Sequence, residues 1–167
     1  AQLDLIDRKE ADGGLVDCLV VQTLWEMKRA NAAADRASEA IARYPENARL
    51  YCLRGLSRLA LGMKDQGIAD LQCAVSLWPD SGNFRYVLAR FLEQSGRLDE
   101  AAIHLRDAVD LRPDDVQYRL GLANVLVRQS PQNRPEAIAV LEQARKLKLS
   151  PDASKAVESM LATLRQP

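Results

Sequence analysis

The stretch that decides the fold covers residues 47–79 and reads NARLYCLRGLSRLALGMKDQGIADLQCAVSLWP. Its first apolar residues, among them Leu50, Leu53 and Leu56, are three residues apart, which places them along one face of a helix. Gly62 interrupts the pattern, and glycine readily takes the left-handed backbone conformation that ends a helix. A second helical pattern follows and stops at the final proline. The stretch therefore predicts two helices joined by a tight turn.

The same pattern recurs along the chain with a fixed period. Pro45, Pro79 and Pro113 are each 34 residues apart, and Gly62 and Gly96 share this spacing. Internal repetition at such a period indicates a fold built from stacked copies of one unit. We assign four copies, to residues 14–45, 48–79, 82–113 and 116–149, the last of them stretched by the segment 129–135.

Periodicity and turn residues together predict the helices. Asp65 and Asp99 are expected to cap the second helix of their copies, and Ser150 followed by Pro151 is typical of a helix start. Residues 1–13 form an N-terminal segment that is compatible with the tail of a preceding repeat. The expected helices cover residues 15–28, 31–43, 47–61, 65–77, 81–95, 99–111, 115–128, 134–147 and 152–165.

This arrangement of small residues and prolines resembles the tetratricopeptide repeat. The resemblance implies an all-α fold, a right-handed α-solenoid of antiparallel helix pairs, with about four repeats in a single domain over residues 1–167. Residues 150–167 would form a C-terminal capping helix. The family implies binding and not catalysis, because its first helices line a concave groove that takes an extended peptide or a helix of a partner protein.

Carried over residue by residue, the groove positions predict a graded contact surface. The first two copies supply mainly apolar side chains and the last two supply polar ones, so we expect a ligand with apolar side chains and a polar or acidic group near Arg90. Intramolecular packing of these leucines, for instance against residues 1–10, is the alternative. The predicted contact residues are Trp25, Leu53, Leu56, Leu59, Tyr86, Arg90, Asn124 and Arg128.

Composition excludes several other classes of protein. The 23 basic and 23 acidic residues give a net charge of zero and aromatic residues make up 5%, so no nucleic-acid partner is expected. No apolar run approaches the roughly 20 residues of a membrane span, so no membrane insertion is expected. The expected partner is a protein or a peptide.

Catalysis, metal binding and cofactors are not expected either. His104 is the only histidine, and the three cysteines, Cys18, Cys52 and Cys73, contain no C-x-x-C pair. Reduced thiols favour the cytoplasm, while a periplasmic location stays open.

Two alternatives to a peptide-binding scaffold remain at this stage. The repeats could be a structural module of a larger enzyme or of an envelope or secretion assembly. They could also form a homo-oligomer, with the apolar N-terminal repeat packing on a second copy.

Overall fold

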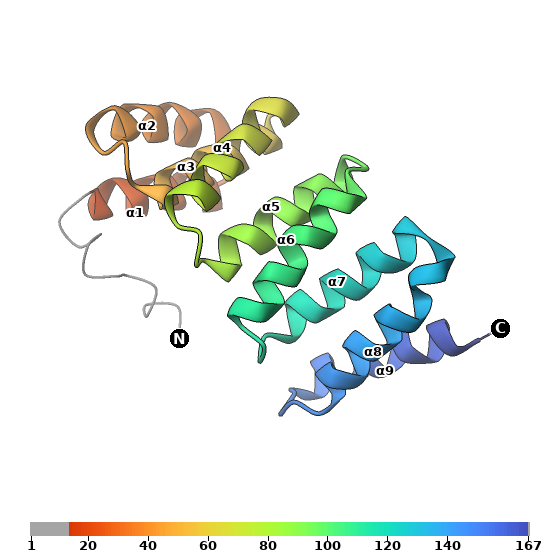
Figure 1. Ribbon diagram of the computed structural model, residues 1–167. Coiled ribbons are helices and arrows are strands. Elements are labelled where there is room, and N and C mark those ends of the chain that lie inside the picture. The colour runs from red at the N-terminus through yellow and green to blue at the C-terminus, as the bar shows by residue number, and fades with distance from the viewer. Residues whose placement is uncertain (1–13, 167) are drawn as a thin grey trace. The chain divides into compact units, whose positions relative to one another are not determined.

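The computed structural model describes residues 14–166, and within that range every regular element is helical (Figure 1). Most predicted helices begin and end within one residue of their predicted bounds, and the fourth copy includes a short 3₁₀ helix, η1 (Pro131–Asn133). The α-helices are α1 (Leu15–Glu26), α2 (Ala30–Arg43), α3 (Ala48–Ala60), α4 (Lys64–Leu77), α5 (Gly82–Gln94), α6 (Leu98–Leu111), α7 (Val116–Gln129), α8 (Arg134–Arg145) and α9 (Pro151–Arg165).

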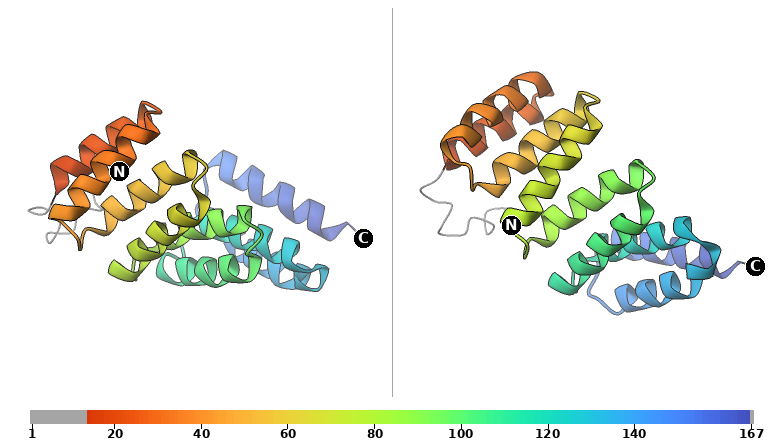
Figure 2. Two further views of the ribbon diagram at one scale, coloured as in Figure 1. Left: turned by 90° about the horizontal axis from the view of Figure 1, so that it is seen from above. Right: turned by 45° about the horizontal axis from the view of Figure 1, so that its top comes forward.

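The chain divides into two compact units, one ending at Pro79 and the next beginning at Asp80. In the first unit α2 packs against α1 and α3, and α3 packs against α4. In the second unit each helix from α5 to α8 packs against the α-helix that follows it. Figures 1 and 2 show the antiparallel pairs α1–α2 and α3–α4 in the first unit, and α5–α6 and α7–α8 in the second. The predicted all-α fold of antiparallel helix pairs is confirmed.

The turns between paired helices explain where the helices end. Gly62 and Gly96 have φ angles of 79° and 77°, so the predicted left-handed glycines are confirmed. The prediction that Asp65 and Asp99 cap the following helices is wrong, because both lie inside the first turn of α4 and α6. The turn after each glycine is so short that the next helix has already begun before the aspartate. The two carboxylates therefore lie near the positive N-terminal end of the helix dipole, where a negative charge is stabilising.

Two glycines set the distance between α3 and α4. A Cβ atom built on Gly55 would lie 2.9 Å from the carbonyl oxygen of Gly67, and one built on Gly67 would lie 2.5 Å from Cγ of Leu59. The two helix backbones therefore touch with no room for a side chain. Leu71, fully buried on α4, packs against the same contact.

Lys28 occupies a turn position where the second and third copies have glycine. Its φ of 58° is the one positive value among non-glycine residues of the described range, and the period of 34 aligns it with Gly62 and Gly96. The left-handed conformation brings Cβ close to the backbone and destabilises residues other than glycine. Replacing Lys28 by glycine is therefore expected to raise the free energy of unfolding of the first unit by about 0.5–1 kcal/mol.

Urea denaturation followed by tryptophan fluorescence measures this change, since Trp25 and Trp78 are the only tryptophans and both belong to the first unit. Lys28→Ala is the control, because alanine removes the charge but keeps the strained Cβ. Equal stability of the glycine and alanine variants would contradict a backbone origin of the effect.

Candidate functional site

The predicted contact residues of the first unit do not all reach the surface. Leu53 is 8% exposed and belongs to the core cluster with Cys18, Val21 and Leu50, so its side chain offers little surface to a ligand. It is buried because α1 packs onto α3 along the face that carries it. Three other predicted residues, Trp25, Leu56 and Leu59, are partly buried.

The α1–α3 face is joined by polar contacts beside these residues. The guanidinium of Arg49 on α3 donates a hydrogen bond to Oε1 of Gln22 on α1, at 2.6 Å. Gln22 in turn donates to Glu26 one helical turn further on, at 2.9 Å. The exposed Leu19 lies one turn before this pair of contacts, at 52% exposure. We call Leu19, Gln22, Trp25, Arg49 and Leu56 the α1–α3 face.

In the second unit, side chains of α5 and α7 converge on one carboxylate. Glu93 on α5 is buried, with 8% of its side chain exposed. Its Oε1 atom accepts a hydrogen bond from Nδ2 of Asn124 at 2.6 Å and another from the guanidinium of Arg128 at 2.5 Å, both on α7. Bonds to an ionised acceptor are short and strong, so they tie α7 to α5 at this point.

Arg90 completes this cluster from the side of α5. Its Nε atom lies 3.9 Å from Oε2 of Glu93, an ion pair without a hydrogen bond. It donates instead to the hydroxyl of Tyr86 at 3.1 Å, and its guanidinium carbon lies 5.8 Å from the centroid of that ring. The Tyr86 ring packs against Tyr118 of α7 with 5.1 Å between ring centroids. We call Tyr86, Arg90, Glu93, Asn124 and Arg128 the α5–α7 face.

The charges of the α5–α7 face do not balance. Arg90 and Arg128 each keep 49% of their side chains exposed, and they share the single carboxylate of Glu93. With two arginines and one glutamate, the face carries one excess positive charge. It brings together all four contact residues predicted for this unit, Tyr86, Arg90, Asn124 and Arg128. Glu93, which is essential to the arrangement, was missed as a site residue. The sequence did contain a signal for Glu93, because this acid aligns with the apolar residues Leu59 and Val127 of the neighbouring copies.

Comparison with known proteins identifies the repeats. The family model described as tetratricopeptide repeat matches residues 52–116. Residues 52–116 carry tetratricopeptide repeats. No curated protein matches the chain. Many solved structures are similar to this chain, among them the following three, all of low sequence identity.

The first of these structures is that of MamA, 18% identical, with a TM-score of 0.71 over 81% of this chain and 79% of MamA. The second is YrrB, described as a tetratricopeptide protein with an unusual peptide-binding site, 18% identical with a TM-score of 0.72 over 93% of this chain and 79% of YrrB. The third is TTC0263, a tetratricopeptide protein of Thermus thermophilus, 19% identical with a TM-score of 0.66 over 89% of this chain and 81% of TTC0263. These likenesses establish the tetratricopeptide fold.

The three cysteines and the single histidine, considered above for metal binding and catalysis, all lie in helices. Over residues 14–166 no three histidine, cysteine or acidic side chains lie together as a metal site. Cys18 and Cys52 are buried, and burial raises the pKa of Cys52 to about 12, so this thiol stays protonated. Cys73 is an exposed free thiol. Among the helices described, none is long and apolar enough to span a bilayer.

His104 is half-buried on α6, and its Nδ1 atom is buried with no hydrogen-bond partner in the part of the chain that the structure describes. Burial, aided by the nearby Arg85 cation, lowers its pKa below the ordinary 6.5, although Asp107 and Glu100 act in the opposite direction. The folded unit thus binds a proton less readily than the unfolded chain. The free energy of unfolding of the second unit is expected to fall as the pH drops below about 6.5 and to level off below the folded-state pKa.

An NMR titration tests this directly, because the single histidine gives one imidazole signal. Its midpoint should lie below 6.5 in the folded protein and move up in concentrated urea. The variant His104→Phe should remove this part of the pH dependence. A folded-state midpoint at or above the urea value would refute the prediction.

Proposed function

We propose that this chain is a non-catalytic scaffold that holds a peptide or a partner helix against the first helices of its repeats. The observation that carries the proposal is the α5–α7 face, where two half-exposed arginines share one buried glutamate. The peptide-binding site named for YrrB, a protein of the same fold, supports the class of ligand.

The arrangement favours an acidic group of the ligand at Arg90. This guanidinium makes no hydrogen bond to Glu93 and contacts only the neutral Tyr86 hydroxyl at close range. A ligand carboxylate could therefore bind it without breaking a hydrogen bond to Glu93. The Tyr86 ring beside it offers an aromatic surface for an adjacent side chain. Aromatic and arginine side chains are the commonest anchors of protein interfaces.

On the α1–α3 face we propose contacts with apolar side chains of the ligand. Trp25 and Leu56 are partly exposed there and Leu19 is largely so, while Leu59 lies against Gly67 and contributes less. The buried Leu53 is left out of this surface. Each face is proposed for its own unit.

Selection from a random peptide display library on the immobilised protein, followed by affinity measurement of the recovered peptides, tests the proposal. Arg90→Gln should weaken an acidic peptide about tenfold, because a charge-assisted hydrogen bond is lost. Glu93→Gln should strengthen the same peptide, since it removes the competing carboxylate while keeping an acceptor for Asn124 and Arg128. Unchanged affinities in both variants, with the helix content retained, would rule out this face as the site.

A second candidate function, self-association through α1, is favoured by an exposed apolar face. Val16, Leu19, Val20 and Met27 are 72%, 52%, 39% and 60% exposed. The period of 34 aligns Val16 with Leu50 and Tyr118, which are 0% and 3% exposed on helices that α2 and α6 cover.

Val16 therefore marks a side of α1 that corresponds, in later copies, to a surface on which another helix packs. Sedimentation at two protein concentrations tests whether a second copy covers it. A dimer that Val16→Glu disrupts, while the matched variant Ile103→Glu on α6 leaves it intact, would support self-association. A monomer at both concentrations would exclude it.

A further inference from the structure

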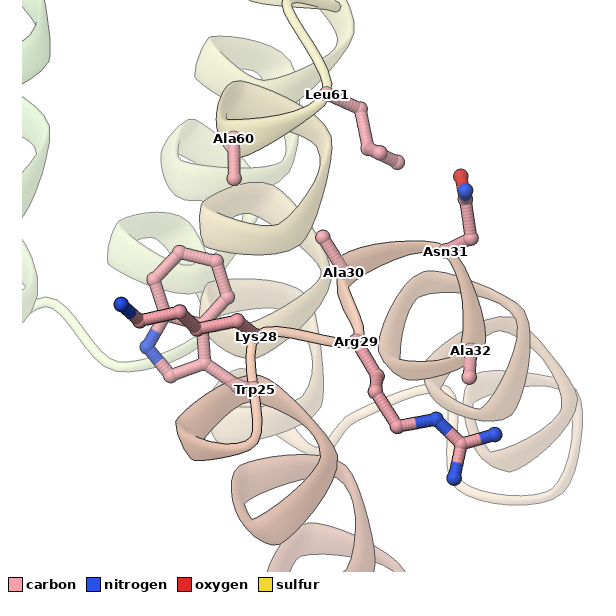
Figure 3. A pocket seen from close by; sticks show the side chains of 8 residues that line it. All are labelled: Trp25, Lys28, Arg29, Ala30, Asn31, Ala32, Ala60 and Leu61. Carbon is pink, nitrogen blue, oxygen red and sulfur yellow. The ribbon is translucent and has the colours of Figure 1, made fainter.

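The turn between α1 and α2 forms one side of an open hollow in the first unit, with a volume of about 680 Å³ (Figure 3). Trp25, Ala60 and Leu61 supply apolar walls, and Lys28 and Arg29 stand at the turn itself. In Figure 3 the Lys28 side chain extends on the side of the Trp25 indole, and the Arg29 side chain extends to the opposite side of the turn. The hollow thus combines apolar walls with two cations.

The charges at this hollow have no ionic partner within residues 14–166. Neither Lys28 nor Arg29 forms an ion pair with any residue of the described range, and no acidic residue lines the hollow. The nearest acid in the sequence, Glu26, accepts a hydrogen bond from Gln22. A negatively charged occupant would therefore meet a cation without an ionic partner among the described residues, Lys28 on one side of the turn or Arg29 on the other.

Lysine at position 28 also adopts a backbone conformation that glycine adopts more readily. The amide of Lys28 donates to the carbonyl of Trp25, and the amide of Arg29 donates to that of Leu24, both at 2.9 Å, which holds the turn in its left-handed form. The two equivalent turns in later copies are built the same way with glycine. A strained residue that persists beside a hollow is the kind of outlier that points to a function.

We propose that this hollow binds an acidic polypeptide segment in which a carboxylate side chain stands next to an apolar one. The carboxylate binds Lys28 or Arg29, and the apolar side chain packs against Trp25, Ala60 and Leu61. The inference shares with the proposed function only the premise that the ligand is a polypeptide. Its residues, apart from Trp25, lie outside the α1–α3 and α5–α7 faces.

Lys28→Gly gives an unusually clean test because it removes the charge while relieving the backbone. We would titrate the protein with a fluorescein-labelled octapeptide that alternates glutamate with leucine and phenylalanine, and follow anisotropy. The dissociation constant should rise about tenfold in Lys28→Gly although the variant melts at a higher temperature than the wild type. Lys28→Arg keeps the charge and should retain the affinity.

Two controls separate this site from the rest of the molecule. Gly96→Lys places the same strained lysine in an equivalent turn and should leave binding unchanged. A peptide with glutamine in place of glutamate should bind at least about tenfold more weakly.

Three outcomes would overturn the inference. These are equal affinity of Lys28→Gly and wild type, equal affinity of the two peptides, or no binding of the acidic peptide up to about 1 mM. If Arg90→Gln weakens the acidic peptide and Lys28→Gly does not, the peptide binds the α5–α7 face. The proposed function then stands and this site does not. The reverse result supports the hollow and removes the α5–α7 face.

Discussion

Replacing Asp70 by asparagine is expected to lower the free energy of unfolding of the first unit by about 3 kcal/mol. Asp70 is 3% exposed on α4 and is the only acid that the two arginines beside it contact among the described residues. Arg54 donates two hydrogen bonds to it, at 2.9 Å and 2.6 Å, and Arg58 donates a third at 2.7 Å. The amide cannot balance two guanidiniums that are only 16% and 24% exposed.

Urea denaturation with tryptophan fluorescence measures this effect for the first unit alone. Glu39→Gln is the matched control, since Glu39 forms a single ion pair with Arg36 and its side chain is 66% exposed. That control should change the stability by less than about 0.5 kcal/mol. A loss in Asp70→Asn no larger than in the control would mean that water compensates Arg54 and Arg58 in place of the carboxylate.

Gly55→Ala is expected to destabilise the first unit by about 2 kcal/mol, although alanine favours a helix by about 1 kcal/mol over glycine. The new Cβ atom would lie 2.9 Å from the carbonyl oxygen of Gly67 and 3.1 Å from Cγ of Leu71. A backbone carbonyl within a helix cannot move aside alone. The pair α3–α4 must therefore separate, which loosens the packing around the fully buried Leu71.

Gly121→Ala is the matched substitution in the second unit and should have the opposite sign. Its Cβ atom would meet side-chain carbons of Leu105 and Tyr86, at 3.2 Å and 3.3 Å, and these can shift slightly. We expect a gain of about 0.5 kcal/mol from helix propensity, measured by circular dichroism during urea denaturation. If both glycine substitutions stabilise the protein, the Gly55–Gly67 contact does not determine how closely α3 and α4 approach each other.

Local sequence signals were sufficient for the helices and turns. The three-and-four spacing of apolar residues, the glycines at 62 and 96 and the prolines at the ends of copies act on neighbouring residues of the chain. Such signals are readable without knowing what lies across the interface. Repetition strengthened them, because each signal occurs in register in several copies. The helix starts at Asp65 and Asp99 were misjudged by one or two residues because a cap depends on turn geometry.

Packing between helices decided the rest. Leu53 and Leu56 look alike in the sequence, yet contact with α1 buries the first and leaves the second half-exposed. Glu93 is an ordinary exposed-looking acid until α7 brings Asn124 and Arg128 to its oxygen. Burial and the pairing of charges depend on residues about thirty positions away, and no local pattern of side chains specifies that proximity. The helical repeats could thus be predicted from the amino-acid pattern, whereas which of their side chains stay available for a ligand depended on how the helices pack.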